Sequence, residues 1–463
     1  MKQTEIGLIP DDWKEHTLRD LIDILTDYTA NGSFESLARN VRYLEYPSYA
    51  RLIRLTDIRT NFTNEGVYVS KYSYDFLKKS SLHGGELLLA NVGAYAGFSF
   101  IYPENLMFRG TLGPNMFLIK FFNQKIDNTF AYYAFSHGAV YNQLISKAAS
   151  SAQPKLNKED VRTCYINIPS SIQEQQRIAK ALSDVDALIS TTEKLIQKKK
   201  NIKQGSMQEL LTGKKRLPGF GDKQTDLFVP NGTHTKEVKD VNPEQIRLSA
   251  KMKQTELGEI PEDWEVKALN ELINDISDGP FGSNLKTEHY TTEREVRIIQ
   301  LSNVGEDGWD NENVKYTTFT HAKEIQRCIV PYGSIVIAKM MPAGRAILCP
   351  NKEKMYILGS DCVRISPNNL LDSLFFMYFS KTSFYLNQIK ENTQGSTRAR
   401  TSVSKLKRIE IALPSKEEQT AIANVLSSMD KEIETLNTKL EKYRNLKTAM
   451  MQQLLTGKIR LVK

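Results

Sequence analysis

The stretch MKQTEIGLIPDDW at residues 1–13 returns almost unchanged as MKQTELGEIPEDW at residues 252–264. A second pair closes the two halves of the chain, with QELLTGKKRL at 208–217 and QQLLTGKIRL at 452–461. Short repeated units indicate a stacked array, but two copies of this length indicate two complete modules. The ends of the modules agree and their interiors differ. The sequence therefore predicts one shared framework that presents two different binding surfaces.

The bulk composition is that of a globular protein with a basic balance. The 463 residues allow two to four domains, each with its own core, and 62 Lys and Arg against 54 Asp and Glu give a net charge of +8. This charge permits a polyanionic partner without requiring one. The four cysteines are scattered without a CxxC pair, and no apolar run is long enough to cross a bilayer. We therefore expect a cytoplasmic protein in a reducing compartment, without membrane association, disulfide framework or metal site.

Each half begins with a globular part made of short apolar runs separated by turns. RLIRLTDI at 51–58 matches RIIQLSNV at 297–304, so the two interiors keep common positions. Runs of this type, bounded by Gly and Pro, are typical of β-strands. The expected strands lie at 86–90, 115–120, 334–338 and 361–365.

After Pro169 and Pro414 the pattern becomes helical. Apolar residues recur at alternating steps of four and three, which is the heptad seam of a coiled coil. The seam consists of Ile178, Leu182, Val185 and Ile189 in the first copy and Ile422, Leu426, Met429, Ile433, Leu436 and Leu440 in the second. We expect helices over 175–211 and 419–455, each roughly 55 Å long at about 1.5 Å per residue, with a Thr-Gly pair ending each one.

A long helix with a bare apolar seam needs a partner. The favoured interpretation packs the two helices of the chain antiparallel, because the Gly- and Pro-rich segment 218–251 provides a return path. The alternative is that each helix packs on its own globular part.

Motifs for catalysis are weak. The acidic turn at 261–263, with the lysine that follows it, resembles the pattern of metal-dependent nucleases, but the first copy does not keep the lysine spacing. Asp12 and Asp263 are therefore interpreted as parts of structural turns that place Trp13 and Trp264 in the core. No HExxH, GxSxG, phosphate-loop or kinase motif is present. We expect a chain that is not an enzyme by itself.

A binding surface is the better interpretation of the polar stretches 150–158 and 394–402, which hold the same place in both modules with different residues. Arg, Lys and Gln pair with base edges or phosphates. Loops after the central strands supply further candidates. The candidate DNA-binding residues are Tyr95, Arg109, Gln153 and Lys155 in the first module and Lys339, Arg345, Arg398 and Arg400 in the second.

Taken in order, the motifs resemble those of the specificity subunits of type I restriction–modification systems. The resemblance covers the whole chain, including the duplication. It rests on IPDDW at 9–13, IPEDW at 260–264, IP at 168–169 with EQQRIA at 174–179, LP at 413–414 with EQTAIA at 418–423, and LLTGK at 210–214 and 454–458.

The resemblance implies a mixed α/β fold, with two tandem target-recognition domains joined by two long antiparallel helices as a pseudo-twofold repeat. The implied segments are domains at 1–170 and 252–415, long helices within 171–217 and 416–463, and a linker at 218–251. Each domain would read one half of an asymmetric, bipartite site in double-stranded DNA.

The implied partners are two methyltransferase subunits, docked on the helices, and motor-nuclease subunits. S-adenosylmethionine, Mg²⁺ and ATP would be bound by those partners, with no cofactor on this chain. Two other classes stay open at this point: a coiled-coil scaffold that binds proteins, and a nuclease that uses the acidic turns.

Overall fold

The computed structural model describes residues 1–149, 153–221, 247–248, 251–306, 308–340, 343–393 and 400–462. The chain forms two compact units, which are described separately. The first unit comprises Met1–Lys194 with Thr438–Lys463, and the second comprises Leu195–Asn437. Each unit thus contains one globular part, the beginning of the long helix that follows it, and the end of the other long helix.

The first unit contains two four-stranded sheets. One has the order β4 (Ile22–Asp27), β11 (Met116–Phe121), β8 (Leu87–Ala90), β9 (Ser99–Ile101), with antiparallel pairs throughout. The other has the order β6 (Tyr68–Val69), β5 (Ala50–Ile53), β10 (Arg109–Leu112), β7 (Ser81–Leu82), with β5 and β10 parallel.

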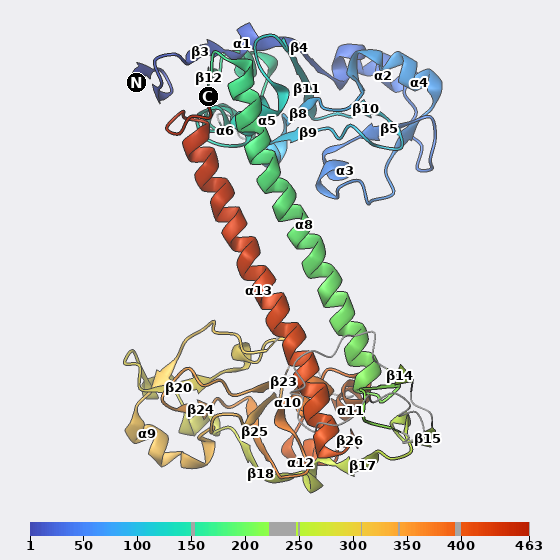
Figure 1. The fold of residues 1–463 in the computed structure, drawn as a ribbon, viewed down its shortest axis with the longest axis vertical. Helices are drawn as coiled ribbons and strands as arrows, with labels where there is room; N and C mark the ends of the chain where they lie inside the picture. The colour runs from blue at the N-terminus through green and yellow to red at the C-terminus, as the bar shows by residue number, and fades with distance from the viewer. Residues whose placement is uncertain are drawn as a thin grey trace, which may run out of the picture. The chain divides into compact units, whose positions relative to one another are not determined.

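Two short antiparallel pairs and a set of helices complete this unit. The pairs are β1 (Lys2–Thr4) with β2 (Gly7–Ile9), and β3 (Lys14–Thr17) with β12 (Tyr165–Ile168). The helices are α1 (Leu18–Leu21), α2 (Phe34–Asn40), α3 (Leu55–Arg59), α4 (Lys71–Phe76), α5 (Asn128–Ser136), α6 (Ala139–Ala148) and α7 (Lys158–Arg162). Figure 1 shows α2 and α4 at the end of the unit remote from α5 and α6.

The second unit repeats this plan. Its sheets have the orders β18 (Ile273–Asp278), β25 (Cys362–Pro367), β22 (Ile335–Ala338), β23 (Ala346–Leu348), and β19 (Tyr290–Thr291), β21 (Tyr316–Thr317), β20 (Val296–Ile299), β24 (Tyr356–Leu358). The strand pairs are β15 (Met252–Thr255) with β16 (Gly258–Pro261), and β17 (Glu265–Ala268) with β26 (Glu410–Leu413). The helices are α9 (Phe319–Glu324), α10 (Ser373–Phe379), α11 (Ser383–Thr393) and α12 (Val403–Lys407).

The central strands explain the continuous apolar runs in the sequence. Alternate residues of a strand point to opposite faces of its sheet. Leu87 and Leu89 of β8 lie in one core, and Leu88 lies in the other. Ile335 and Val336 of β22 are divided between two cores in the same way. Both faces are therefore buried, and the four predicted strands are confirmed within two residues at each end.

The long helices are α8 (Ile172–Leu210) and α13 (Lys416–Leu454), each of 39 residues. Each begins three residues before its predicted start, because the hydroxyls of Ser171 and Ser415 accept hydrogen bonds from the amides of Glu174 and Glu418. Each ends before a glycine with positive φ, 70° at Gly213 and 67° at Gly457. The mixed α/β class with two long helices is confirmed.

The seam residues divide into two groups. Ile178 and Leu182 are buried in the core of the first unit, which also contains Met451 and Leu454 from the end of α13. Ile422 and Leu426 likewise share the core of the second unit with Leu210 and Leu211 of α8. Val185, Ile433 and Leu440 are also buried, whereas Ile189, Met429 and Leu436 are only half-buried. The start of each helix therefore packs on its own globular part, as the alternative interpretation held, and together with the end of the other helix.

Helix–helix ion pairs occur within each unit. In the first unit Arg444 pairs with Glu193 at 2.8 Å and Lys447 with Asp186 at 2.7 Å. In the second, Lys199 pairs with Glu432 at 2.7 Å, and Lys203 pairs with Asp430. The residue numbers rise along one helix as they fall along the other, so the paired segments within each unit are antiparallel.

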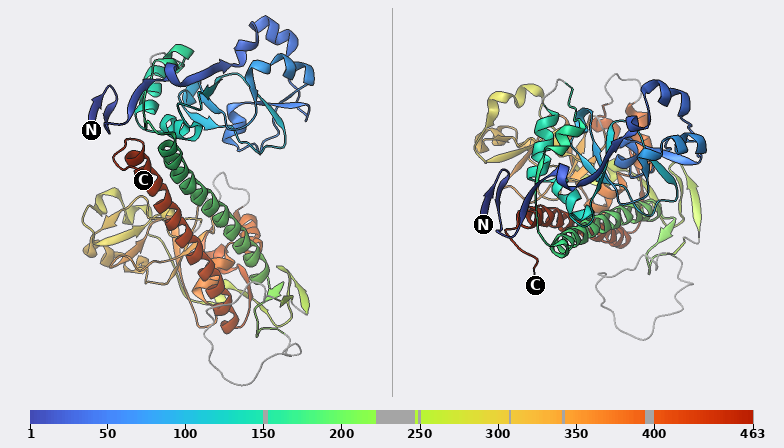
Figure 2. Two further views of the ribbon diagram at one scale, coloured as in Figure 1. Left: turned by 45° about the horizontal axis from the view of Figure 1, so that its top comes forward. Right: turned by 90° about the horizontal axis from the view of Figure 1, so that it is seen from above.

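One short strand lies just before the predicted linker 218–251, and another lies within it. β13 (Lys215–Arg216) pairs with β14 (Arg247–Leu248). Most of the predicted linker lies outside the described residues. In the first unit, the β1–β2 hairpin and the end of α13 lie side by side (Figures 1 and 2), with Gly457 against Pro10.

Candidate nucleic-acid interface

The repeated motifs meet at one place in each unit. In the second unit the guanidinium of Arg216 donates to both carboxylate oxygens of Asp263 at 2.9 Å and to Glu418 Oε2 at 2.7 Å. The ring of Trp264 lies below that guanidinium, and its Nε1 donates to Glu418 Oε2 at 3.2 Å. We call Arg216, Asp263, Trp264 and Glu418 the second motif cluster. It joins the end of α8 to the opening turn of the second half and to the start of α13.

The first unit contains the equivalent cluster, formed by Arg460, Asp12, Trp13 and Glu174. Arg460 donates to Asp12 at 2.7 and 2.8 Å and to Glu174 at 2.6 and 2.8 Å, and it lies 5.9 Å from the centre of the Trp13 ring. We call this the first motif cluster. The interpretation of Asp12 and Asp263 as turns that place a tryptophan in the core is confirmed, since both tryptophans are fully buried.

Hydrogen bonds and burial shift the pKa values of the carboxyl groups in the clusters. The hydrogen bond from Arg460 lowers the pKa of Asp12, and the one from Arg216 lowers the pKa of Asp263. Burial raises the pKa of Glu418, and the hydrogen bond from Arg216 opposes this effect. The acidic turns are therefore held by arginines of the repeat.

The glutamine of each EQ motif fixes a second contact. The side-chain oxygen of Gln175 accepts from the amide of Asp127 at 2.9 Å, and that of Gln419 accepts from Asp372 at 2.8 Å. Asp127 and Asp372 cap the first turns of α5 and α10. The repeated residues thus form the frame that positions the strands and loops of each unit.

This frame brings the predicted binding stretches to the loops after the central strands. In the first unit Val92 forms a β-bridge with Lys155, and the Leu156 amide donates to the Asn91 carbonyl at 2.8 Å. In the second, Met340 forms a β-bridge with Arg400, and the Thr401 amide donates to the Lys339 carbonyl at 2.9 Å. Equivalent backbone positions therefore hold Lys155 in one unit and Arg400 in the other.

In the first unit the candidates differ in what they contact. Gln153 and Lys155 are exposed, and Tyr95 is half-buried beneath the guanidinium of Arg59, 4.4 Å from its ring centre. Arg109 begins β10 in the other sheet and lies 4.5 Å from the ring centre of Tyr49. Gln153, Lys155 and Tyr95 thus belong to one loop region, and Arg109 contacts another.

In the second unit Arg400 is exposed and lies 3.6 Å from Asp361. Lys339 is only 5% exposed, and its ammonium is paired with Asp278. Arg345 is half-buried and donates to the carbonyl of Val304 at 3.1 Å. Lys339 and Arg345 therefore hold loops in place, while Arg398 lies outside the described residues.

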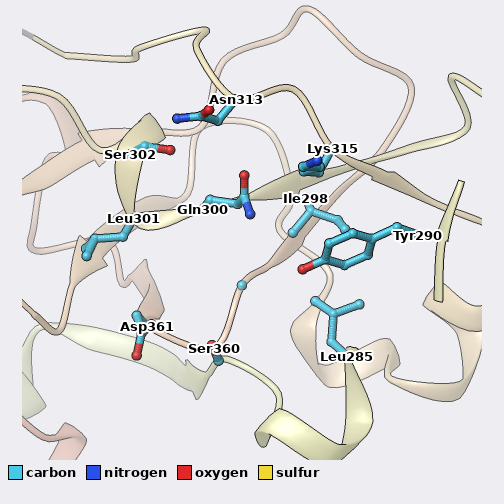
Figure 3. A pocket seen from close by; sticks show the side chains of 11 residues that line it. Leu285, Tyr290, Ile298, Gln300, Leu301, Ser302, Asn313, Lys315, Ser360 and Asp361 are labelled. Atoms are coloured by element: carbon cyan, nitrogen blue, oxygen red, sulfur yellow. The ribbon is translucent and has the colours of Figure 1, made fainter. Parts of the chain in front are cut away.

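A pocket in each unit was not anticipated from the sequence. The first unit has one of about 670 Å³ beside Lys155, lined also by Phe34, Tyr43, Asn91 and Asn115. The second unit has one of about 370 Å³ lined by Gln300, Asn313, Lys315 and Asp361 among others (Figure 3). A signal was available in the matched stretches 51–58 and 297–304, where Arg54 is replaced by Gln300.

Two kinds of feature are absent from the described residues. In that part of the chain no group of three or more His, Cys, Asp or Glu side chains could hold a metal ion. Across the same residues, none of the helices is both long and apolar enough to span a membrane.

The profile of the type I restriction modification DNA specificity domain matches residues 10–203 and 261–442, which is most of both halves. The chain belongs to the type I restriction–modification specificity subunit family. Both matched segments begin in an opening turn and run into a long helix. The family match therefore follows the same duplication that the motif clusters show.

Relatives among specificity subunits span nearly the whole chain. The MjaVIII type I restriction enzyme specificity subunit of Methanocaldococcus jannaschii is 25% identical over 98% of this chain and 94% of its own length. A protein of the same organism, assigned provisionally as the MjaX specificity subunit, is 28% identical over 99% and 96%. The crystal structure of the Mycoplasma genitalium (M. genitalium) S subunit has a TM-score of 0.55 at 15% identity, covering 98% of each chain. That likeness shows a shared fold.

Proposed function

We propose that this specificity subunit recognises an asymmetric, bipartite sequence in double-stranded DNA. The predicted recognition domains, 1–170 and 252–415, would each contact one half of the site. One observation carries the proposal: the same β-bridge position presents exposed Lys155 in one unit and exposed Arg400 in the other. A common frame with different exposed side chains is what two half-sites of different sequence require.

The chemistry of these surfaces suits DNA. Lysine and arginine neutralise phosphates, and arginine and glutamine also pair with base edges in the major groove. The net charge of +8 adds a non-specific attraction, so binding should weaken steeply as salt rises. Among the candidate residues, those best supported as direct contacts are Tyr95, Gln153, Lys155 and Arg400.

The long helices would fix the spacer between the half-sites and dock two methyltransferase subunits. Once one domain is bound, a fixed separation presents the second at high effective concentration. The helices carry exposed apolar side chains, which suit a protein interface. These side chains are Leu188 and Leu446 in the first unit and Leu195 and Ile202 in the second.

The chemistry of the complex would belong to the partners. S-adenosylmethionine for adenine N6 methylation would bind the methyltransferase subunits, and Mg²⁺ and ATP would serve motor-nuclease subunits that cleave unmodified DNA. This chain would then supply recognition and assembly and no catalytic group.

Mapping of adenine methylation at base resolution tests the proposal. DNA would come from cells that co-express this chain with its methyltransferase, and cells that express the methyltransferase alone are the control. We expect a split, asymmetric motif that appears only with this chain. Background methylation despite a purified, assembled complex would contradict the proposal and favour a protein-binding scaffold.

A further inference from the structure

The pocket of the second unit joins an apolar wall to a polar wall within about 370 Å³. Leu285, Tyr290 and Ile298 form the apolar part. Figure 3 shows the amide of Gln300 and the hydroxyl of Tyr290 pointing towards the middle of the pocket, with Leu285 on the side opposite Gln300. The hollow therefore combines flat apolar contacts with hydrogen-bonding groups, as ligand pockets generally do.

The polar groups of this pocket are not used by the protein itself. Within the described residues, the side chains of Gln300, Asn313 and Lys315 and the hydroxyl of Tyr290 have no hydrogen-bond or ion-pair partner. Gln300 and Tyr290 are half-buried, whereas Asn313 and Lys315 are exposed. The half-buried amide of Gln300 and hydroxyl of Tyr290, which point into the pocket, are therefore free to bind a ligand there.

The pocket adjoins the predicted DNA-contacting loop. Asp361, at its rim, lies 3.6 Å from Arg400, and its carbonyl accepts from the amide of Lys339 at 2.8 Å. The loop that follows β24 is held to the end of β20, because the Gly359 amide donates to the Ile299 carbonyl at 2.8 Å. A DNA molecule held by Arg400 would therefore pass this pocket.

The donor set distinguishes between the parts of DNA. A phosphate group accepts hydrogen bonds only, so it could pair with Lys315 but would leave the amide oxygens without a donor and would be repelled by the Asp361 carboxylate. An amide offers one acceptor beside one donor, which matches the N6 amine and N7 of adenine. Gln300 and Asn313 provide two such amides.

The first unit does not have this arrangement. Its Gly113 amide donates to the Ile53 carbonyl at 2.7 Å, which places Arg54 at the position of Gln300. The Nε of Arg54 is bonded to Asp57 at 3.1 Å, and Val67 occupies the position of Lys315. The pocket chemistry is therefore specific to the second unit.

We propose that the pocket around Gln300 binds an adenine base of the half-site read by the second recognition domain, with the Gln300 amide pairing to N6 and N7. This inference rests on the proposed function. The same adenine edge is available from a base stacked in the duplex or from an unstacked one, and the experiment separates the two.

The protein arm of the test uses Gln300→Met, which removes the amide and keeps the length of the side chain. Gln326→Met is the matched control, because Gln326 is exposed in the same unit and does not line the pocket. Methylation motifs are mapped for both variants and the wild type, each with its methyltransferase. We expect Gln300→Met to lose the preference for adenine at one position of one half-site, by about tenfold or more, and Gln326→Met to keep the full motif.

The DNA arm needs no variant and so does not depend on folding. Wild-type complex is titrated with duplexes in which each adenine of the motif, apart from the methylated one, is replaced by purine or by 7-deazaadenine. We expect one position in one half-site to weaken with both analogues, by about tenfold. A fluorescence rise from 2-aminopurine placed next to that adenine identifies an unstacked adenine, and its absence identifies a stacked one.

Different results would contradict the pocket assignment and the proposed function. A wild-type split motif that Gln300→Met leaves unchanged, together with no analogue-sensitive adenine in either half-site, would overturn the pocket assignment alone. A uniform loss of binding at all sequences would also overturn it, since that marks a backbone contact. Absence of any split motif for the wild type would overturn the proposed function instead.

Discussion

The two motif clusters contain the same residue types and the same arginine–carboxylate contacts, yet their arginines differ in exposure to water and their tryptophans differ in hydrogen bonding. The side chain of Arg216 is 5% exposed, whereas that of Arg460 is 24% exposed. Trp264 donates to Glu418, but Trp13 Nε1 has no partner among the described residues. The repeated sequence therefore fixes which charged groups pair but not how strongly they attract each other, because access to solvent sets the strength of that attraction.

The buried arginines of the two units differ more sharply. Arg51 is paired with Asp57 at 2.7 Å, and both side chains are buried. Arg297 occupies the same position but is fully buried against backbone carbonyls at 3.3–3.5 Å, because Asn303 replaces the aspartate. Burial lowers the pKa of Arg297. One unit thus buries an ion pair, and the other buries a charge without a carboxylate.

The largest expected effect comes from replacing each of these arginines by methionine. Arg51→Met should reduce the stability of the first unit by about 3–4 kcal/mol, because the buried Asp57 loses its buried charged partner and keeps only the partly exposed Arg54 as a cation. Arg297→Met should change the second unit by less than about 1 kcal/mol, since a buried charge is exchanged for an apolar chain of similar length. Hydrogen exchange of peptides from each unit measures both. Equal losses would show that the carboxylate partner does not decide the cost.

The next effect concerns the arginines of the clusters. Arg216→Ala should lower the free energy of unfolding of the second unit by about 3 kcal/mol, and Arg460→Ala should lower that of the first by about 1.5 kcal/mol. These are the upper and lower values for hydrogen bonds to charged groups. The more buried arginine has the larger effect because less water replaces it. Urea unfolding followed by limited proteolysis of each unit compares them. A reversed order would mean that exposure does not control these contacts.

A smaller difference is expected from the tryptophans. Trp13→Phe and Trp264→Phe remove the same atoms from two cores, but only the second removes a hydrogen bond, so it should cost about 1 kcal/mol more. Melting temperatures of the two single variants give the comparison. Equal melting temperatures would indicate that the hydrogen bond from Trp264 to Glu418 makes no net contribution to stability.

The smallest effect is on pH dependence. The folded pKa values of Asp12 and Asp263 are lowered, so their stabilising contributions are present above the unfolded value of about 3.9 and are lost as pH falls through the folded values. The raised pKa of Glu418 acts in the opposite sense: its contribution is present below the unfolded value and lost as pH rises. The first unit should therefore be more sensitive to acid between about pH 5 and pH 2.

Asp12→Asn provides the control for this pH effect. The variant should lose the extra acid sensitivity of the first unit, as followed by hydrogen exchange across that range. Persistence of the full sensitivity in Asp12→Asn would assign it to another carboxylate.

The sequence predicted the framework because its signals are local. The apolar runs within 86–90 and 334–338 predicted the central strands, and heptad spacing predicted both helices. Contacts between residues far apart in the sequence could not be predicted from such local patterns. Lys339 was predicted as a DNA-binding cation, but Asp278, 61 residues earlier, holds it in the interior.

The pocket around Gln300 was missed for a related reason. Tyr290, Gln300 and Lys315 lie on or beside strands that become neighbours only through the order β19-β21-β20. Each residue alone is an ordinary polar side chain on a short strand. Only the register of the sheet places them around one hollow.

The first motif cluster has a consequence for the order in which the protein matures on the ribosome. Multidomain chains usually complete their N-terminal domain first. Here the first unit needs Thr438–Lys463, and Arg460 is synthesised 286 residues after its partner Glu174. Arg216, by contrast, is made before Asp263 and Glu418 and is already present when they emerge. The first unit is therefore completed after the second.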